Sequence, residues 1–132
     1  MLKKPRESNI AQNKNRLFKL EPKYLIPKIW RSIIDQYGYY RHYFPKSIML
    51  FQVGSYYEFY HQFENKVLQL LRLTGLTKNK RKALYGFPIR KEAYYRQLLL
   101  KNGYSVLIVK ETGNSYCRIK EREVVSHYVI QN

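Results

Sequence analysis

Large apolar residues in the first third of the chain follow the spacing of one helical face. Pro27 is a favoured first helical residue. It precedes four apolar side chains at positions i, i+3, i+4 and i+7, namely Trp30, Ile33, Ile34 and Tyr37. The pattern predicts a helix that begins near Pro27. It leaves open whether the helix ends at Gly38 or continues to Pro45.

The next segment predicts two strands that meet at Gly54. Residues 47–53, SIMLFQV, are almost continuously apolar, which is typical of a central strand buried on both faces. Gly54 allows a bend, and the following residues alternate between two faces, with Tyr56 and Glu58 on one and Tyr57 on the other. Because carboxylates are rarely buried, we expect Tyr56 and Glu58 to be exposed and Tyr57 to lie in the core.

Helical and strand patterns then alternate to the end of the chain. The remaining predicted elements are a helix with the stripe Phe63, Val67, Leu70 and Leu71 and a cap at Gly75, a helix over 91–102 stopped by Gly103, a strand over 104–109, a turn at 111–115, and a hairpin of 116–119 with 123–130. Cys117 fits the hairpin as a small apolar filler. This order predicts an α/β fold with a mixed β-sheet flanked by helices.

The chain is strongly basic and rich in tyrosine. Its 132 residues fit one compact domain and include 25 Lys and Arg against 9 Asp and Glu, a formal net charge of +16, and 14 tyrosines. An AT-rich genome would raise Lys and Tyr but would not explain the shortage of acids. Such a charge attracts polyanions, nucleic acid before anionic membranes, and tyrosine rings can stack on bases.

The charge pattern divides the chain into an arm and a domain. Residues 1–21 carry several cations and few large apolar residues, so we expect a flexible basic arm outside the core. Residues 22–132 are expected to form a nucleic-acid-binding domain. Since the sequence contains neither a signal-peptide pattern nor an apolar stretch of spanning length, we expect a cytoplasmic protein without a membrane partner.

Catalytic patterns are scarce. His42, His61 and His127 lack metal-ligand spacing, the single cysteine excludes a cysteine zinc site within the chain, and no G-x-x-x-x-G-K-[ST] phosphate loop occurs. A nuclease that uses His, Lys and Tyr as general acid and base stays open as an alternative. We predict a protein that is not an enzyme and that needs neither cofactor nor metal.

Five segments of the chain, in order, resemble the N-terminal mismatch-recognition domain (domain I) of MutS DNA mismatch-repair proteins. They are "IMLFQVGSYYEFY", "LLRLTGLT", "GFP", "YYRQLLLKNGYSVLIVKETG" and "REVV". The resemblance covers about residues 27–130 and implies the fold of that domain, a mixed sheet flanked by helices. Since the family continues into a connector and an ATPase where this chain ends at Asn132, we expect a freestanding module.

The resemblance also implies roles for single residues. In the family, a Phe-x-Glu motif after a glycine reads the mismatch from the minor groove: the ring stacks on a base and the glutamate hydrogen-bonds to it. Gly54 matches that glycine, Tyr56 the phenylalanine and Glu58 the glutamate. Tyr56 departs from the family by a hydroxyl that needs a partner within the base stack. The family's Glu-Gln pair reads Glu111-Thr112, and no role is carried onto it.

Cations between residues 78 and 91 occur without any acid and predict contacts to phosphates: Lys78, Lys80, Arg81, Lys82, Arg90 and Lys91. The first of them resemble the basic Thr-Lys-Arg loop of the family. We therefore predict a DNA-binding module that recognises mismatched or distorted duplex and works with a larger repair or mobile-element enzyme. The alternative is an RNA- or single-strand-binding accessory protein of a reverse transcriptase or another mobile-element enzyme.

Overall fold

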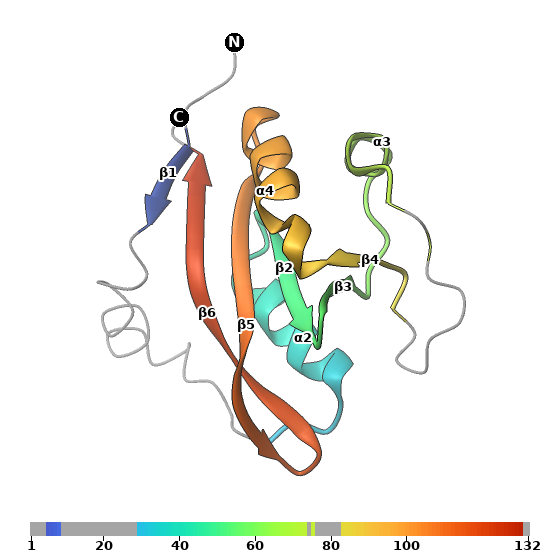
Figure 1. Ribbon diagram of the computed structural model, residues 1–132, viewed down its shortest axis with the longest axis vertical. Coiled ribbons are helices and arrows are strands. Elements are labelled where there is room, and N and C mark those ends of the chain that lie inside the picture. The colour runs from blue at the N-terminus through green and yellow to red at the C-terminus, as the bar shows by residue number, and fades with distance from the viewer. Residues whose placement is uncertain (1–4, 9–28, 74, 76–82, 131–132) are drawn as a thin grey trace.

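The computed structural model describes residues 5–8, 29–73, 75 and 83–130. These residues form a six-stranded sheet in the order β1-β6-β5-β2-β3-β4 (Figure 1). The elements are β1 (Pro5–Ser8), α2 (Ile33–Tyr43), β2 (Ser47–Val53), β3 (Tyr56–Phe59), α3 (Asn65–Leu71), β4 (Tyr85–Pro88), η2 (Ile89–Lys91), α4 (Glu92–Lys101), β5 (Ser105–Tyr116) and β6 (Ile119–Ile130).

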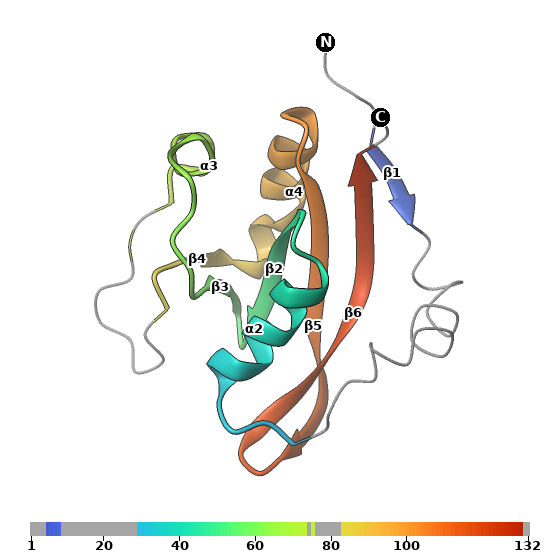
Figure 2. The ribbon, with the colours of Figure 1, turned by 180° about the vertical axis from the view of Figure 1, so that it is seen from behind.

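The sheet is mixed and carries helices on both faces, which confirms the predicted fold class. Strands β2 and β5 pair in parallel, and the other neighbours are antiparallel. Helix α4 lies in front of the sheet in Figure 1. Helix α2 lies on the opposite face and comes to the front in the reversed view of Figure 2. Helices α3 and α4 cover the same face, since Val67 and Leu99 belong to one buried cluster.

The sheet separates two hydrophobic clusters. Leu50 of β2 packs with Tyr57 and Phe59 under α3 and α4, whereas its neighbours Met49 and Phe51 pack with Tyr37 of α2 and with other residues of the second face. β2 is therefore buried on both faces, as its continuous apolar run predicts, and its bounds agree with residues 47–53.

Helix α2 begins later than the apolar spacing predicts. Ser32 is the N-cap, and its Oγ accepts a hydrogen bond from the backbone N–H of Asp35 at 3.1 Å. Trp30 therefore precedes the helix, and Pro27 lies outside the described residues. The helix does not stop at Gly38 but continues to Tyr43, because the large residues on either side of the glycine stay on the buried face.

The predicted glycine cap of α3 is also wrong. The helix ends at Leu71, and Arg72 adopts the left-handed conformation with φ of 51°, while its N–H bonds to the carbonyl of Leu68 at 2.9 Å. Gly75 instead forms an isolated antiparallel bridge to Tyr85. Helix α4, by contrast, ends where predicted, with Asn102 as its cap and Gly103 at a φ of 86°.

Strands β5 and β6 form one long hairpin whose tip differs from the prediction. Residues 111–115, predicted as a turn, belong to β5 and coincide with a register shift against β6. The turn is made by Cys117 and Arg118, which have φ of 51° and 71° and join the paired residues Tyr116 and Ile119. Cys117 is therefore exposed at the tip and does not fill a strand.

Part of the predicted basic arm is a strand. Residues 5–8, within the range 1–21, form β1, which pairs antiparallel with the end of β6, from Pro5 opposite Ile130 to Ser8 opposite His127. The prediction of an arm outside the fold is wrong for these four residues. The boundary at residues 21 and 22 lies outside the described residues. Among the residues that the structure describes, no helix has the length and apolar character needed to cross a membrane.

Candidate nucleic-acid interface

The turn between β2 and β3 presents one tyrosine to solvent and buries the next. Gly54 has a φ of 62°, so Gly54 and Ser55 reverse the chain tightly between the paired residues Val53 and Tyr56. Tyr56 is 41% exposed, whereas Tyr57 is fully buried among the core residues under α3 and α4. Both environments agree with the alternation read from the sequence.

Glu58 is buried, and the expectation that it is exposed is wrong. Its side chain lies on the same face of β3 as Tyr56 but deeper under α2, and the residue is only 3% exposed. The hydroxyl of Tyr60 donates a hydrogen bond to Glu58 Oε1 at 2.7 Å, and the Tyr60 ring packs edge-on against Tyr37 of α2 at 5.1 Å. A carboxylate is tolerated there because it is hydrogen-bonded.

A cleft of about 550 Å³ joins this turn to the β5–β6 hairpin. One wall consists of residues 53–56 together with Glu58, and the opposite wall consists of hairpin residues that include Arg118, Lys120 and Arg122. The cleft therefore brings together the three predicted residues Gly54, Tyr56 and Glu58. It also adds cations that the motif pattern did not single out.

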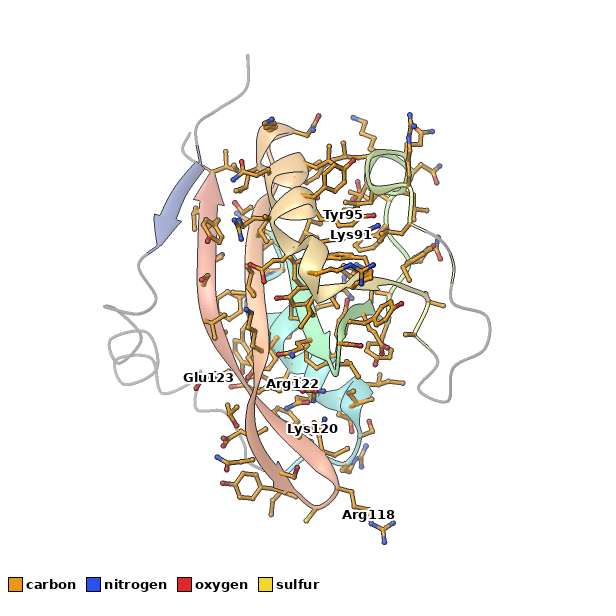
Figure 3. All side chains as sticks on the ribbon, in the orientation of Figure 1. Lys91, Tyr95, Arg118, Lys120, Arg122 and Glu123 are labelled. Carbon is orange, nitrogen blue, oxygen red and sulfur yellow. The ribbon has the colours of Figure 1, made fainter. Side chains whose placement is uncertain are left out.

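The hairpin cations differ in exposure. Arg118 projects from the hairpin tip, and Lys120 and Arg122 follow along β6 toward the sheet (Figure 3). Lys120 is more than half exposed, with its Nζ 3.7 Å from Glu111 Oε1, whereas Arg122 is 3% exposed. Two exposed cations, Arg118 and Lys120, thus line the cleft together with one buried cation, Arg122.

Arg122 is held by acceptors from three elements. Its Nε donates to the carbonyl oxygen of Gln52 at 2.7 Å, its Nη1 to Gln36 Oε1 at 2.6 Å, and its Nη2 lies 3.2 Å from Glu111 Oε2. The guanidinium also lies over the Phe51 ring at 4.6 Å. Burial lowers the pKa of Arg122, and the adjacent Glu111 carboxylate opposes that shift, so the side chain stays charged.

The predicted phosphate contacts fall in two groups. Arg90 and Lys91 are exposed in η2, which begins beside the tyrosine turn because the Ile89 N–H donates to the carbonyl oxygen of Ser55 at 2.9 Å. Neither of them lines the cleft. The other predicted cations, Lys78, Lys80, Arg81 and Lys82, lie outside the described residues.

Glu111 and Arg122 could have been paired from the sequence only with the correct hairpin tip. They are cross-strand partners in the β5–β6 ladder. A turn placed at Cys117 and Arg118 brings these opposite charges face to face, whereas a turn at residues 111–115 separates them. The sequence signal for this pair was therefore the opposite charge of two residues that face each other across the hairpin. It was hard to find because the hairpin turn contains neither glycine nor asparagine.

A second hollow of about 350 Å³ lies at the other end of β2 and is bordered by Arg41, Lys46 and His61. His61 Nδ1 and the Tyr37 hydroxyl are 2.7 Å apart. Burial, with a smaller contribution from Arg41, lowers the pKa of His61 from 6.5 to about 4. Its imidazole is therefore neutral near pH 7. Within the described part of the chain, no group of three or more His, Cys, Asp or Glu residues could hold a metal ion.

The described fold and site define a class: an α/β domain on a mixed sheet, with an exposed aromatic ring beside a cleft bordered by cations. Residues 31–131 match the family model of MutS domain I. The chain belongs to this family, whose domain is the mismatch-recognition domain of MutS. It is 32% identical over 88 residues to the DNA mismatch repair protein MutS of Nostoc punctiforme, an alignment that covers 61% of this chain and 10% of that relative.

Proposed function

We propose that this domain binds DNA and distinguishes mismatched or distorted duplex from regular duplex by inserting the Tyr56 ring beside an opened base. The observation that carries this proposal is the contrast between Tyr56, 41% exposed at the rim of the cleft, and its fully buried neighbour Tyr57. An aromatic ring that leaves the core while its neighbour anchors the strand has the rigidity that a wedge needs.

The selectivity follows from the cost of opening a base step. A wedge partly unstacks the duplex, which costs on the order of a few kcal/mol per step, and the cost is smallest for mismatched or unpaired bases. The ring recovers part of that cost by stacking on the exposed base. A phenol does this as well as a phenyl ring, provided that its hydroxyl finds water or a polar group in the groove.

Glu58 would act from inside the cleft. An ionised carboxylate only accepts hydrogen bonds, so it favours a base edge that presents an N–H group and repels phosphate. The Tyr60 hydroxyl donates to Oε1 and holds the carboxylate in place within the cleft. The base edge must enter the cleft to reach it, because Glu58 does not project from the surface.

The cations are proposed to hold the backbone while the ring tests the base. Arg90 and Lys91 are exposed beside the tyrosine turn, and Lys78, Lys80, Arg81 and Lys82 precede them in the sequence. Phosphate contacts supply affinity and fix the register without reading sequence. Since the chain spans about a tenth of the length of its MutS relative, we propose that it is the DNA-recognition part of a larger repair assembly.

The test is a titration of three labelled ligands at several salt concentrations: a matched duplex, the same duplex with one mismatch, and an RNA hairpin. We expect log Kd to rise linearly with log salt for all three, and the mismatched duplex to bind most tightly. Equal affinities for the two duplexes would remove mismatch recognition, and tightest binding to the hairpin would favour RNA. Incubation of labelled DNA and RNA with and without magnesium should give no cleavage.

A further inference from the structure

The backbone of Gly54 is held from both sides by side chains. Its N–H donates to Glu111 Oε2 at 3.0 Å, and its carbonyl oxygen accepts from Gln52 Nε2 at 3.0 Å. The two side chains are joined, because the N–H of Glu111 donates to Gln52 Oε1 at 3.0 Å. We call Gln52, Glu111 and Arg122 the turn clamp.

Arg122 fixes the clamp from below. It shares Glu111 Oε2 with the Gly54 N–H and also donates to the carbonyl oxygen of Gln52, so it touches both other members. Gln36 of α2 and the ring of Phe51 hold the guanidinium itself. The clamp therefore links the exposed turn at Gly54 and Ser55 to the buried side chain of Arg122 in the hairpin.

We infer that Glu111, oriented by Arg122, is a positioning residue for Tyr56. Gly54 lies two residues before the ring at a φ of 62°, so a change at Gly54 re-aims the first residue of β3. The contacts from Glu111 and Gln52 go to the N–H and C=O of Gly54, within the turn, as a role in turn geometry requires. This inference rests on the proposed function of Tyr56.

The expected benefit of the clamp is preorganisation. If the backbone of the turn samples several conformations, the Tyr56 ring points in several directions before binding. The turn must then be ordered on binding, which costs free energy and reduces selectivity. Without the contact from Glu111 to Gly54, the domain would still attract DNA through its exposed cations. It would lose preference between duplexes rather than overall affinity.

Three variants separate positioning from stability. Glu111→Ala removes the acceptor for the Gly54 N–H, whereas Glu111→Gln keeps an oxygen that can accept it. Val124→Ala serves as the matched control, because Val124 is fully buried in β6 yet belongs to the cluster under α2 and not to the clamp. All measurements are made at a temperature at which circular dichroism shows each variant fully folded.

The first readout is amide hydrogen exchange at Gly54 in the free protein. We expect Glu111→Ala to raise the exchange rate about tenfold or more, corresponding to the loss of one well-formed hydrogen bond. Glu111→Gln and Val124→Ala should stay near the parent rate. Unchanged protection in Glu111→Ala would refute the clamp, whatever the domain binds.

The second readout is the ratio of affinities for mismatched and matched duplex in a double-mutant cycle with Tyr56→Ala. We expect Glu111→Ala to lower the ratio, Glu111→Gln to restore most of it, and the double variant to lose no more than Tyr56→Ala alone. An unchanged ratio in Glu111→Ala, with a ratio lowered by Tyr56→Ala, refutes positioning and leaves the proposed function standing. If Tyr56→Ala itself leaves the ratio unchanged, the proposed function fails, and positioning of a reading ring fails with it.

Discussion

At the scale of single residues, Tyr56 and Tyr57 are neighbours on one strand with opposite environments. Tyr57 lies under α3 and α4, and its hydroxyl donates to Glu92 Oε1, which also fixes its ring. Burial, reinforced by Glu92, raises the pKa of Tyr57 well above its usual range, so this phenol stays protonated. Tyr56 is 41% exposed, as its proposed contact with a base requires.

The side chain at position 56 should control selectivity. Tyr56→Ala removes the ring and should reduce the preference for mismatched duplex by roughly 5- to 150-fold, the equivalent of about 1–3 kcal/mol of stacking per base. Tyr56→Phe keeps the ring and should retain most of the preference. Tyr94→Ala is the matched control, since Tyr94 is 64% exposed but lies on α4. A uniform loss of affinity for both duplexes would make Tyr56 a structural residue instead.

Arg122 should matter for stability. Arg122→Ala removes one partner of a buried ion pair with Glu111 and takes away the donor to Gln36 Oε1 and to the Gln52 carbonyl oxygen. We therefore expect a loss of about 3–5 kcal/mol of unfolding free energy. Urea denaturation measures it. Arg31→Ala, at an ion pair on the surface, should cost less than about 1 kcal/mol. Equal effects of the two substitutions would contradict the role of the buried network.

The alternation of side chains along β3 was sufficient to predict that Tyr56 is exposed and Tyr57 is buried, because successive residues of a strand point to opposite faces. It was not sufficient for Glu58. That carboxylate is buried because a local partner, Tyr60, is itself held by a helix more than twenty residues earlier. The burial propensity of amino acids places a glutamate at the surface. It does not account for the Tyr60 hydroxyl, which packing brings within 2.7 Å of the Glu58 carboxylate.

At the scale of elements, the β5–β6 hairpin reaches past the rest of the sheet (Figure 1). Its residues line the cleft together with those of the tyrosine turn. Both residues of its turn adopt left-handed conformations without being glycine, which is a conformation that most side chains avoid. The turn places Arg118 at the hairpin tip, and Arg118 and Lys120 both line the cleft.

The hairpin cations should contribute to phosphate binding. Replacing Arg118 and Lys120 together by alanine should lower the slope of log Kd against log salt by up to about two units, since each contact releases roughly one counterion. The control is Lys66→Ala with Lys101→Ala, which removes the same charge from α3 and from the far end of α4 (Figure 1). Equal changes in slope for both pairs would mean that only net charge matters.

Elements with strong local signals were predicted well, and those set by distant contacts were not. Strand β2 has a continuous apolar run between Lys46 and Gly54, and α4 ends at an Asn-Gly stop. The hairpin turn was misplaced because Gly113 and Asn114 are the usual turn residues. They form a bulge here, where Asn114 and Thr112 bond to Glu121 of the facing strand.

At the scale of the whole molecule, the sheet order could not be derived from the sequence. The parallel pairing of β2 with β5 joins segments separated by two helices and the outer strands β3 and β4. The sequence gives the elements of such a crossover but not which strands become neighbours. The clamp depends on that choice, since it brings Gln52 and Glu111 together.

Stability should fall as the medium becomes acidic. The pKa of His61 is about 4 in the fold against 6.5 ordinarily, so between these values the unfolded chain binds a proton that the folded chain does not. The unfolding free energy therefore decreases as pH falls from about 6.5 toward about 4, and burial lowers the pKa of His127 in the same direction.

Substitution of His61 separates its share of this effect. Urea denaturation at pH 7 and pH 5 should show a smaller loss of stability for His61→Gln than for the parent chain. His42→Gln is the control, because it removes an imidazole that is exposed on α2. A parent chain that is equally stable at both values would contradict the depressed pKa of His61.

The exposed thiol at the hairpin tip gives the molecule a ready spectroscopic handle. Cys117 is the one cysteine in this sequence, and its neighbour Arg118 borders the cleft. A maleimide dye attached there would need no substitution elsewhere, and energy transfer to a fluorophore at either end of a duplex would report which way the helix axis of the DNA runs across the domain.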